Sequence, residues 1–279
     1  MTDNVYGIVV VFNPDVDVVE NIRSYCNCLD ELLIYDNSSS CNLQVFKELL
    51  SDKIKYIYNG CNDGISIALN YALNRYNDGW LLTMDQDSSF IESEFSVFKS
   101  KLIEIPYNTG ILSPKHTSGI LDSSSICGFS VSDIVMTSGN LVNIEIAKKV
   151  SGYDEDYFID CVDWDFCIKL NANGYSVMID NSIILNHGLG DDPVIHKFLN
   201  FNVIVCNYSP FRRYYITRNK LRFFRAYKAL FKRKNYSILL SLFYDLFKIV
   251  FFEKGKVSKL KAFVKGILDY FRGNFGKVV

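Results

Sequence analysis

The chain has 279 residues, of which 49% are hydrophobic and 22% charged, and this composition excludes an intrinsically disordered protein. Its eight cysteines include no CxxC pair, which excludes the common zinc-binding classes and favours reduced thiols in a cytosolic protein. No Lys or Arg precedes the first apolar run, so we expect a strand there and not a secretory signal.

The net charge of −1 conceals two regions of opposite charge. From residue 212 onward, 18 Lys and Arg stand against three acidic residues, and the preceding 211 residues carry a charge of −16. This division indicates two regions with different surroundings or partners. We expect one domain at residues 1–210 and a second region at 211–279.

Short apolar runs rich in β-branched residues alternate with helical patterns over the first 115 residues. The sequence predicts helices near 15–28, 42–50 and 64–76, and strands at 5–12, 31–36, 53–58, 80–84 and 110–114. This alternation predicts an α/β fold with a mostly parallel central sheet covered by helices on both faces. Ligands of such sheets bind beyond the carboxyl ends of the strands. The polar clusters FNP, DNSSS, NGCNDG and DQDSS follow the first four strands, so we expect the functional site at that edge.

Two aspartates, Asp85 and Asp87, stand one residue apart directly after the fourth expected strand. The chain contains neither GxGxxG nor GxxxxGK[ST], so the two common phosphate-binding loops are absent. A divalent cation that bridges the two carboxylates and a diphosphate would offset their mutual repulsion. The alternative is a surface loop with two solvated aspartates.

A second acidic cluster lies at residues 152–175, where six acidic residues fall between 154 and 165. The spacing predicts a helix over 163–173 that ends at an Asn-Gly pair. Asp163 and Asp165 then lie in the first turn, where each favours the helix dipole by roughly 0.3–1 kcal/mol. Six acids exceed what one helix start requires, so this cluster is a second candidate for the site.

Seven blocks occur in order from residue 8 to about residue 190: VVVFNP, YDNSS, NDGISIALN, LTMDQDSS, TSGNLV, GYDEDYFIDCVDWDFCIKLNANGY and NHGLG. Together they resemble the family 2 glycosyltransferases, inverting enzymes with the GT-A fold that use nucleotide sugars. Within that family the chain looks most like bacterial rhamnosyltransferases of surface polysaccharide biosynthesis. The resemblance implies an inverting hexosyltransferase with a GT-A domain and a divalent cation, Mn²⁺ or Mg²⁺.

The resemblance also implies roles for individual residues. It assigns the metal to Asp85, Asp87 and His187, and the catalytic base to Asp163, although Val162 stands where the family usually has a glutamate. Acceptor contacts fall to Ser138, Gly139, Trp164 and Asp165. Donor binding falls to Asn13, Pro14, Asp36, Asn62, Gly64 and Asp85, with Asp36 at the base of the nucleotide. Beyond the resemblance, we expect a cation of the stretch YYITRNKLRF, with Arg218 the first candidate, to assist the departing diphosphate.

Each of these assignments has a simpler structural alternative. Asp36 is suited to capping the turn DNSSS, and Asn62 to starting the helix that follows it. His187 fits an ordinary loop histidine, and Trp164 fits a core residue.

The basic region 211–279 predicts two or three helices. Its most apolar run, SILLSLFYDLFKIVFF, has 16 residues and contains Asp245 and Lys248, so it is too short to cross a bilayer. In the last helix lysines flank an apolar face formed by Val257, Leu260, Val264, Ile267, Leu268 and Phe271. This pattern is typical of a helix that lies in the membrane interface; packing of the helices against one another or in a homodimer is the alternative.

We therefore expect a peripheral protein on the cytoplasmic face of the inner membrane. It is expected to transfer L-rhamnose from dTDP-rhamnose to a polyprenyl-diphosphate-linked glycan of O-antigen or capsule assembly. The alternatives are a UDP-dependent galactofuranosyl- or hexosyltransferase and, in another class, a non-catalytic nucleotide-sugar-binding module. A nucleic-acid partner is disfavoured because the first 211 residues are acidic.

Overall fold

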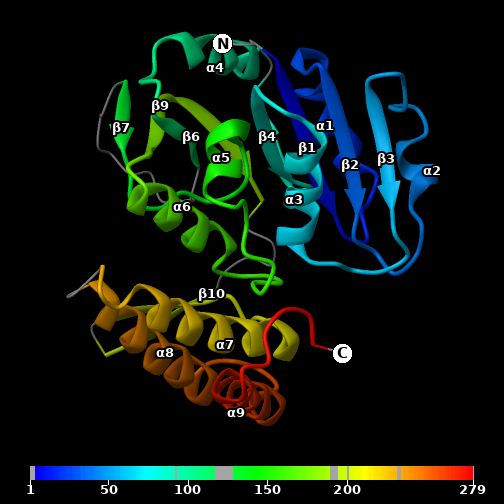
Figure 1. Cartoon of the computed structure of the whole chain (residues 1–279). Coiled ribbons are helices and arrows are strands. Elements are labelled where there is room, and N and C mark those ends of the chain that lie inside the picture. Colours follow the sequence, from blue (N-terminus) through cyan, green and yellow to red (C-terminus); the bar gives the residue numbers. More distant parts are fainter. Residues whose placement is uncertain are drawn as a thin grey trace. The chain divides into compact units, whose positions relative to one another are not determined.

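The computed structural model describes residues 4–91, 93–116, 128–188, 194–199, 201–230 and 234–278. The chain divides into two compact units (Figure 1). The first unit comprises Met1–Asp154 and Val162–Gly188, and the second comprises Glu155–Cys161 and Leu189–Val279. The boundary expected at residue 210 therefore falls inside the second unit.

The first unit is built on a nine-stranded sheet within the described residues. Its strand order is β3-β2-β1-β4-β8-β6-β9-β5, and β7 pairs with β9 outside this path. The strands are β1 Val5–Val11, β2 Glu31–Asp36, β3 Ile54–Tyr58, β4 Trp80–Asp85, β5 Ser88–Phe90, β6 Thr109–His116, β7 Phe129–Val131, β8 Asn140–Asn143 and β9 Ser176–His187.

Four of the five strands expected from the sequence form a parallel run in this sheet, and the fifth, at 110–114, is β6 beyond β8. β3, β2, β1 and β4 are neighbours and run parallel to one another. Beyond β4, the strand β8 pairs antiparallel with both β4 and β6, and β5 pairs antiparallel with β9. The sequence predicted neither β5 nor β9, because a three-residue strand and a partly exposed one lack a continuous apolar run.

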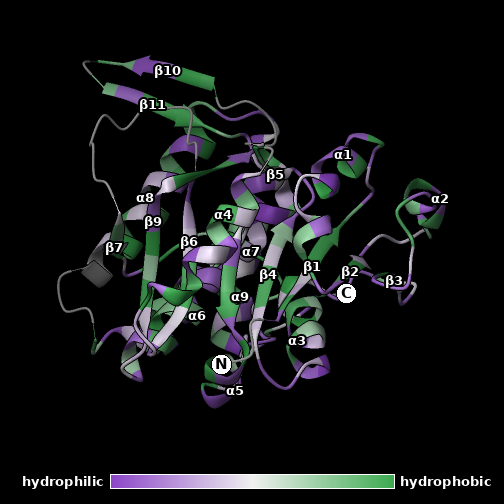
Figure 2. Cartoon of the chain, turned by 90° about the horizontal axis from the view of Figure 1, so that it is seen from above, coloured by the Kyte–Doolittle hydropathy of each residue, from purple (hydrophilic) through white to green (hydrophobic). Residues whose placement is uncertain are grey.

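Successive strand residues point to opposite faces of a sheet, and in β1, β2 and β4 both sets are buried. One set packs with side chains of α1, α2 and α4, and its strand residues include Val5, Val9, Val11, Leu32, Ile34, Leu82 and Met84. The alternate residues Ile8, Leu33 and Leu81 are also fully buried, and α3 contacts β1 and β4. Helices thus cover both faces, as predicted, and Figure 2 shows β1 and β4 largely in the hydrophobic colour.

The helices of the first unit are α1 Asp17–Arg23, η1 Cys26–Cys28, α2 Leu43–Phe46, α3 Ile65–Arg75, α4 Glu94–Ser100, η2 Lys101–Ile103, α5 Ile144–Lys149 and α6 Val162–Ala172. α1, α2, α3 and α6 lie close to predicted helices, whereas α4, η2 and α5 were not predicted. α6 matches the helix predicted over 163–173 and buries Phe166, Cys167 and Leu170. The chain leaves it at Gly174, which has a positive φ of 79° and ends the helix as glycine commonly does.

The second unit contains a hairpin and three helices. The hairpin joins β10 Val194–Phe198 to β11 Phe201–Val205, and the helices are α7 Pro210–Tyr227, α8 Lys234–Phe251 and α9 Lys256–Arg272. Ser209 caps α7 by accepting a hydrogen bond from the Arg212 N–H, and Pro210 occupies the first helical position. Leu242, Ile249 and Phe263 form the core between the helices. Phe198 of the hairpin contacts the rings of Phe247 and Phe252, which explains why this unit begins before α7.

A buried ionic network joins the three helices of the second unit. Arg213 of α7 is 1% exposed and pairs with Asp245 of α8 and with Glu253, and Glu253 also pairs with Lys259 of α9. Lys220 and Lys248 add two further contacts to Asp245. Lys259, one of the lysines expected to flank the apolar face of the last helix, is thus buried as part of this network. Among the described residues, no helix is both long enough and apolar enough to cross a membrane.

Candidate active site

The register of the parallel strands brings the expected site residues to one edge of the sheet. At the carboxyl end of β1, Val10 is paired with Asp85 of β4 and Val11 with Asp36 of β2. Asp36 and Asp85 therefore lie at the same level on either side of β1. The sequence predicted this convergence, because parallel strands end at a common edge.

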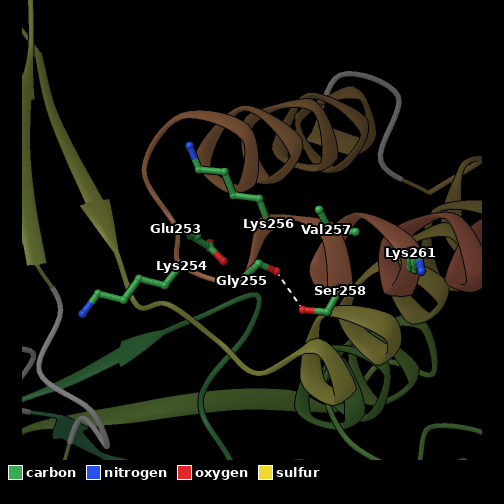
Figure 3. A pocket seen from close by; sticks show the side chains of 7 residues that line it. All are labelled: Glu253, Lys254, Gly255, Lys256, Val257, Ser258 and Lys261. Carbon is green, nitrogen blue, oxygen red and sulfur yellow. Dashed lines mark hydrogen bonds between the residues drawn. The ribbon is translucent and has the colours of Figure 1, made fainter.

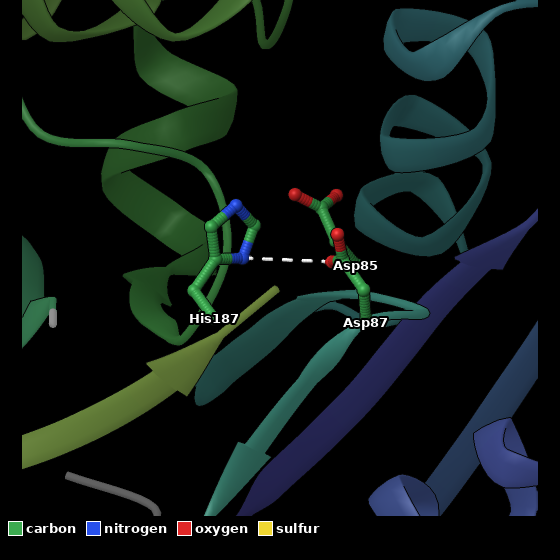
Figure 4. Close-up of side chains that lie close together, drawn as sticks. All are labelled: Asp85, Asp87 and His187. Carbon is green, nitrogen blue, oxygen red and sulfur yellow. Dashed lines mark ion pairs between the residues drawn. The ribbon is translucent and has the colours of Figure 1, made fainter. Parts of the chain in front are cut away.

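Asp85, Asp87 and His187 form the cluster of ionisable groups at this edge (Figure 4). One possible ligand atom from each residue lies within 4.8 Å of the other two. His187 Nδ1 lies 3.5 Å from Asp87 Oδ1. β5 and β9 create this cluster, because their antiparallel register places Ser88 directly opposite His187. Two carboxylates and one imidazole are a donor set that suits a divalent cation such as Mn²⁺ or Mg²⁺.

A chain of buried hydrogen bonds fixes the imidazole against the aspartate turn. The Asp85 N–H donates to Ser138 Oγ at 3.0 Å, the Ser138 hydroxyl donates to Ser88 Oγ at 2.7 Å, and Ser88 Oγ lies 2.7 Å from His187 Nδ1. These bonds hold the imidazole beside Asp87 and connect it to the backbone of the aspartate turn, as is common for a histidine next to a metal site.

The same chain changes the expected role of Ser138 and Gly139. Both were predicted to contact the acceptor, but Ser138 has no exposed surface and its hydroxyl is engaged with Asp85 and Ser88. Gly139 has a φ of 82°, and a Cβ there would lie 2.8 Å from Leu185 and Pro114. The two residues therefore support the aspartate turn from inside the sheet and are not open to an acceptor.

His116 is a site residue that the sequence reasoning missed. Its Nε2–H donates to the Ser138 carbonyl at 2.8 Å, and its ring lies edge-on to His187 with centroids 6.2 Å apart. Burial and nearby His187 lower the pKa of His116, although the bond to Ser138 acts in the opposite direction. The sequence contained one sign of a role at the site, which is that His116 is the last residue of β6.

Gln86, the residue between the two aspartates, is also held by hydrogen bonds. Gln86 accepts a hydrogen bond from the Phe12 N–H at 2.7 Å through its side chain, and its carbonyl accepts from the Asn21 amide at 2.9 Å. Gly188 donates its N–H to the Asp87 carbonyl at 2.9 Å. The turn is thus anchored to β1, α1 and the end of β9, which fixes where both carboxylates point.

Asp36, predicted to contact the donor base, is fully buried. Its carboxylate accepts hydrogen bonds from the Ser38 N–H at 2.9 Å, from Asn42 at 3.1 Å and from the Tyr56 hydroxyl at 2.5 Å. Burial by itself raises the pKa of Asp36, but these hydrogen bonds outweigh it and the pKa lies below its ordinary value. A direct contact with a base is therefore not supported; the carboxylate shapes the loop after β2.

The other expected donor residues lie in the loops around Asp36. Asn13, which has a φ of 47°, donates its N–H to Ser38 Oγ at 2.6 Å, and it is exposed beside Pro14. Asn62 accepts a hydrogen bond from the Gly64 N–H at 2.9 Å, so it shapes the start of α3. Gly64 has a φ of 88°, a conformation that favours glycine. The structure thus brings Asn13 and Pro14 to an exposed rim and gives Asn62 and Gly64 local structural contacts.

Asp163 and Trp164 are partly exposed in the first turn of α6. The helix dipole there favours the ionised carboxylate of Asp163. Asp165, expected to contact the acceptor, is 4% exposed and pairs with Lys169 at 3.4 Å, so its carboxylate serves the helix itself. Burial raises the pKa of Cys167 to about 12, with further contributions from Asp163 and Asp165, so this thiol stays protonated.

A loop connects α6 to the aspartate turn. Asn171 donates to the Asp133 carbonyl at 3.1 Å, and the Cys167 thiol contacts the Val135 carbonyl at 3.8 Å. Further along the loop, the Thr83 hydroxyl of β4 donates to the Thr137 carbonyl at 2.6 Å. Residues 133–138 thus run from α6 to the carboxyl end of β4, and both acidic clusters of the sequence are attached to the same loop.

Arg218, predicted to assist the diphosphate, has no exposed surface. Its guanidinium donates to Asn219 Oδ1 and to the carbonyls of Asn274 and Asp156, all within 3.0–3.3 Å, and lies 4.9 Å from the centroid of the Tyr215 ring. All these partners belong to the second unit, so the predicted contact with a diphosphate is not supported.

Comparison with known proteins defines the class. Residues 8–116 match the model of the family described as glycosyl transferase family 2. The chain therefore carries a family 2 glycosyltransferase domain, and the recognition made from its motifs is confirmed. It is a glycosyltransferase with the GT-A fold.

One curated relative matches over nearly the whole chain. The dTDP-rhamnosyl transferase RfbF of Shigella flexneri is 26% identical over 310 residues, which cover 99% of this chain and 98% of the relative.

Three solved glycosyltransferases share the fold at low sequence identity. The mannosyltransferase PcManGT from Pyrobaculum calidifontis, in complex with GDP-Man and Mn²⁺, has a TM-score of 0.59 at 12% identity and covers 96% of this chain and 87% of its own. S. aureus TarS in complex with UDP-GlcNAc has a TM-score of 0.57 at 14% identity, with 96% and 81% covered. GalNAc-T7 with UDP, GalNAc and Mn²⁺ has a TM-score of 0.55 at 11% identity; the match covers 66% of this chain but only 43% of GalNAc-T7.

The hydrogen bond from Tyr56 to Asp36 gives a pH-dependent prediction. Tyr56→Phe should lower the free energy of unfolding near neutral pH by about 1.5–3 kcal/mol, the range for a hydrogen bond to a charged group. A carboxyl with a lowered pKa stabilises the fold above its unfolded-state pKa, and this stability is lost as pH falls through the folded-state pKa. The variant should therefore lose less stability than the parent on acidification, as measured by urea unfolding across that range.

Tyr58→Phe is the matched control, because the Tyr58 hydroxyl donates to the exposed Ser39 carbonyl at 3.0 Å and not to Asp36. It should leave the acid dependence unchanged. The same acid dependence in Tyr56→Phe as in the parent would contradict the role given to Asp36.

Proposed function

We propose that this chain is an inverting glycosyltransferase that moves L-rhamnose from dTDP-rhamnose to a lipid-linked glycan acceptor of surface polysaccharide assembly. The near full-length similarity to a dTDP-rhamnosyl transferase carries the choice of donor. The cluster of Asp85, Asp87 and His187 supports a nucleotide-sugar reaction at the carboxyl edge of the sheet.

Asp85, Asp87 and His187 would hold the divalent cation. The fit is supported by their donor groups, which are two carboxylates and one imidazole, and by the hydrogen bonds that fix His187 and the aspartate turn. When bound, such a cation supplies Lewis-acid stabilisation of a leaving diphosphate. Two solved structures of the same fold contain Mn²⁺, which supports the choice of metal.

Asp163 is the proposed base of a single displacement. Its carboxylate would accept the proton of the acceptor hydroxyl while that oxygen attacks the anomeric carbon opposite the departing diphosphate. General-base catalysis of this kind contributes about 10²- to 10⁴-fold. Trp164, next to it on α6, offers an aromatic face for a sugar ring.

A UDP-sugar donor is the second candidate. Two of the solved structures with this fold contain UDP or UDP-GlcNAc. A panel of nucleotide sugars assayed for metal-dependent hydrolysis and transfer tests this choice directly. Turnover of dTDP-rhamnose above the UDP-sugars supports the proposal, and the reverse order refutes the rhamnose assignment.

A lipid-linked acceptor places the reaction at a membrane, and the exposed surface of the second unit supports this. α9 exposes Val257, Val264, Leu268 and Phe271, while Leu260 and Ile267 pack inward. α8 exposes Leu240, Phe243, Tyr244 and Phe251. Apolar stripes of this kind beside lysines fit the interface of an anionic bilayer.

The lysines at the start of α9 are suited to contact an anionic membrane surface. Lys254, Lys256 and Lys261 line a shallow cavity of about 650 Å³. Figure 3 shows that the ammonium groups of Lys254 and Lys256 point in different directions. They therefore suit several lipid headgroups better than one bound phosphate. We propose that the enzyme is peripheral on the cytoplasmic face of the inner membrane.

Replacement of Asp87 tests the metal assignment. Asp87→Ala should weaken Mn²⁺ binding by at least tenfold, because it removes one of three ligand groups and leaves Asp85 and His187 alone. Isothermal titration with Mn²⁺ in the absence of donor measures this directly. Asp52→Ala, at an exposed acid in the loop before β3, is the control, and equal Mn²⁺ affinity in the two variants would remove Asp87 from the site.

Replacement of Asp163 tests the base. Asp163→Asn keeps the shape and the helix position, so the kcat for transfer should fall about 10²- to 10⁴-fold while donor affinity stays within about twofold. Full transfer activity in Asp163→Asn would refute the assignment. Asp52→Asn should behave as the parent in the same assay.

Charge reversal on α9 tests the membrane surface. Each cation near an anionic bilayer contributes about 1 kcal/mol, so Lys256→Glu/Lys261→Glu should lower binding to phosphatidylserine-containing vesicles by at least tenfold. Co-sedimentation with anionic and zwitterionic vesicles gives the measurement, and Lys47→Glu/Lys53→Glu in the first unit is the control. Undiminished vesicle binding by the α9 variant would contradict the membrane role. So would a dimer, detected by light scattering, that the α9 substitutions dissociate.

A further inference from the structure

The seven residues before α6 belong to a different unit from the helix itself. Glu155–Cys161 are part of the second unit, whereas Val162 and the rest of α6 are part of the first. We call residues 155–161 the pre-helix segment. Asp163 follows it after one intervening residue, so the backbone of this segment leads directly to the proposed base.

Side chains of α7 hold the pre-helix segment from several directions. Arg212 pairs with Asp160 at 3.3 Å, and Arg222 pairs with Asp156 at 2.8 Å. The Phe158 ring stacks on Tyr215 with centroids 5.0 Å apart. These contacts attach both ends of the segment to one helix of the second unit.

Asn219 makes the most buried of these contacts. It has no exposed surface, and its amide donates to the Ile159 carbonyl at 2.7 Å and to the Asp160 carbonyl at 3.2 Å. Its Oδ1 in turn accepts from the Arg218 guanidinium at 3.0 Å, so the orientation of the amide is fixed. Arg218 also donates to the Asp156 carbonyl at 3.3 Å.

The turn that Asn219 binds has an unfavourable backbone conformation. Asp160 and Cys161 are consecutive non-glycine residues with φ values of 62° and 64°. Left-handed conformations cost free energy for residues with a Cβ, and they persist only where the surroundings impose them. The two carbonyls that Asn219 binds lie at the start of this turn, so its amide is well placed to impose it.

We propose that Asn219, supported by Arg212, is a positioning residue for Asp163. It acts through the pre-helix segment, by holding the left-handed turn at Asp160 and Cys161 that directs the chain into the first turn of α6. The proposal rests on the proposed role of Asp163 as the base. Asn219 contacts none of Asp85, Asp87 and His187, which all belong to the first unit, so its role concerns the base and not the metal ligands.

A purely structural role for Asn219 predicts a different outcome. Loss of a buried amide lowers stability in either case, so stability alone does not discriminate. A positioning role predicts that kcat falls while donor affinity does not, and that the loss disappears once Asp163 no longer acts as a base. Non-additivity of this kind is the signature of residues that act as a unit.

The test is a double-mutant cycle of Asn219→Ala and Asp163→Asn in the full chain. Transfer is measured with radiolabelled donor, and donor and Mn²⁺ affinity by isothermal titration. Asn219→Ala alone should lower kcat about 10- to 100-fold, the scale of a displacement near 1 Å, and should leave donor and Mn²⁺ affinity within about twofold. In the Asp163→Asn background the same substitution should change kcat less than about twofold.

Asn173→Ala is the control. The exposed Asn173 donates its amide to the Lys169 carbonyl at 2.8 Å just beyond the far end of α6, so an asparagine side chain is removed beside α6 without touching the pre-helix segment. Its kcat should equal that of the parent.

Three outcomes overturn the proposal or its basis, and they are distinguishable. Full activity of Asp163→Asn refutes the base itself. An inactive Asp163→Asn combined with an undiminished loss from Asn219→Ala in its background refutes only the coupling. If Asn219→Ala does not fold, Arg212→Ala at a half-exposed position replaces it in the cycle; a several-fold, non-additive loss supports the coupling and unchanged turnover overturns it.

Discussion

The repulsion between two carboxylates at the end of β4 is the constraint on which the site depends. Unit charges about 4 Å apart interact by about 1–4 kcal/mol near a protein surface, so Asp85 and Asp87 need both a partner charge and a rigid support. The support is present in the chain: Ser138 and Ser88 carry hydrogen bonds from the Asp85 backbone to His187, and Gln86 is tied to the end of β1. The partner charge is the role proposed for the cation.

Periodicity in the sequence was sufficient for the parallel strands and the main helices, since continuous apolar runs and helix stops are local signals. The polar clusters at the strand ends brought Asp36 and Asp85 forward as candidates, and the family resemblance added Asp163. The sequence pattern did not separate residues that face a ligand from residues that hold those residues in place. Asp36, Ser138 and Asp165 are polar candidates of the sequence analysis, yet each is buried and engaged by neighbouring groups of the protein. Burial is set by tertiary contacts, and His116 was missed for the same reason, because only strand pairing brings it beside His187.

The division of the chain into units also depends on tertiary contacts that local sequence patterns do not show. Charge composition identified a basic carboxyl-terminal region, but it gave no sign that residues 155–161 belong with it. That association depends on Asn219 and Arg222 reaching back some 60 residues in sequence, a long-range contact that no local pattern encodes. The acidic stretch before α6 therefore has a use that was not visible from capping or metal binding: its charges pair with the arginines of α7.

The ionic network inside the second unit has a consequence for how this sequence can vary. Arg213, Asp245, Glu253 and Lys259 come from α7, α8, the following turn and α9, and all are nearly inaccessible to solvent. Loss of one member of such a group leaves an unpaired charge in the interior and lowers stability. Replacement of the whole set by apolar side chains can leave stability unchanged. Among relatives, these four positions should therefore be inherited as a block: all charged in one lineage, all apolar in another, and rarely mixed.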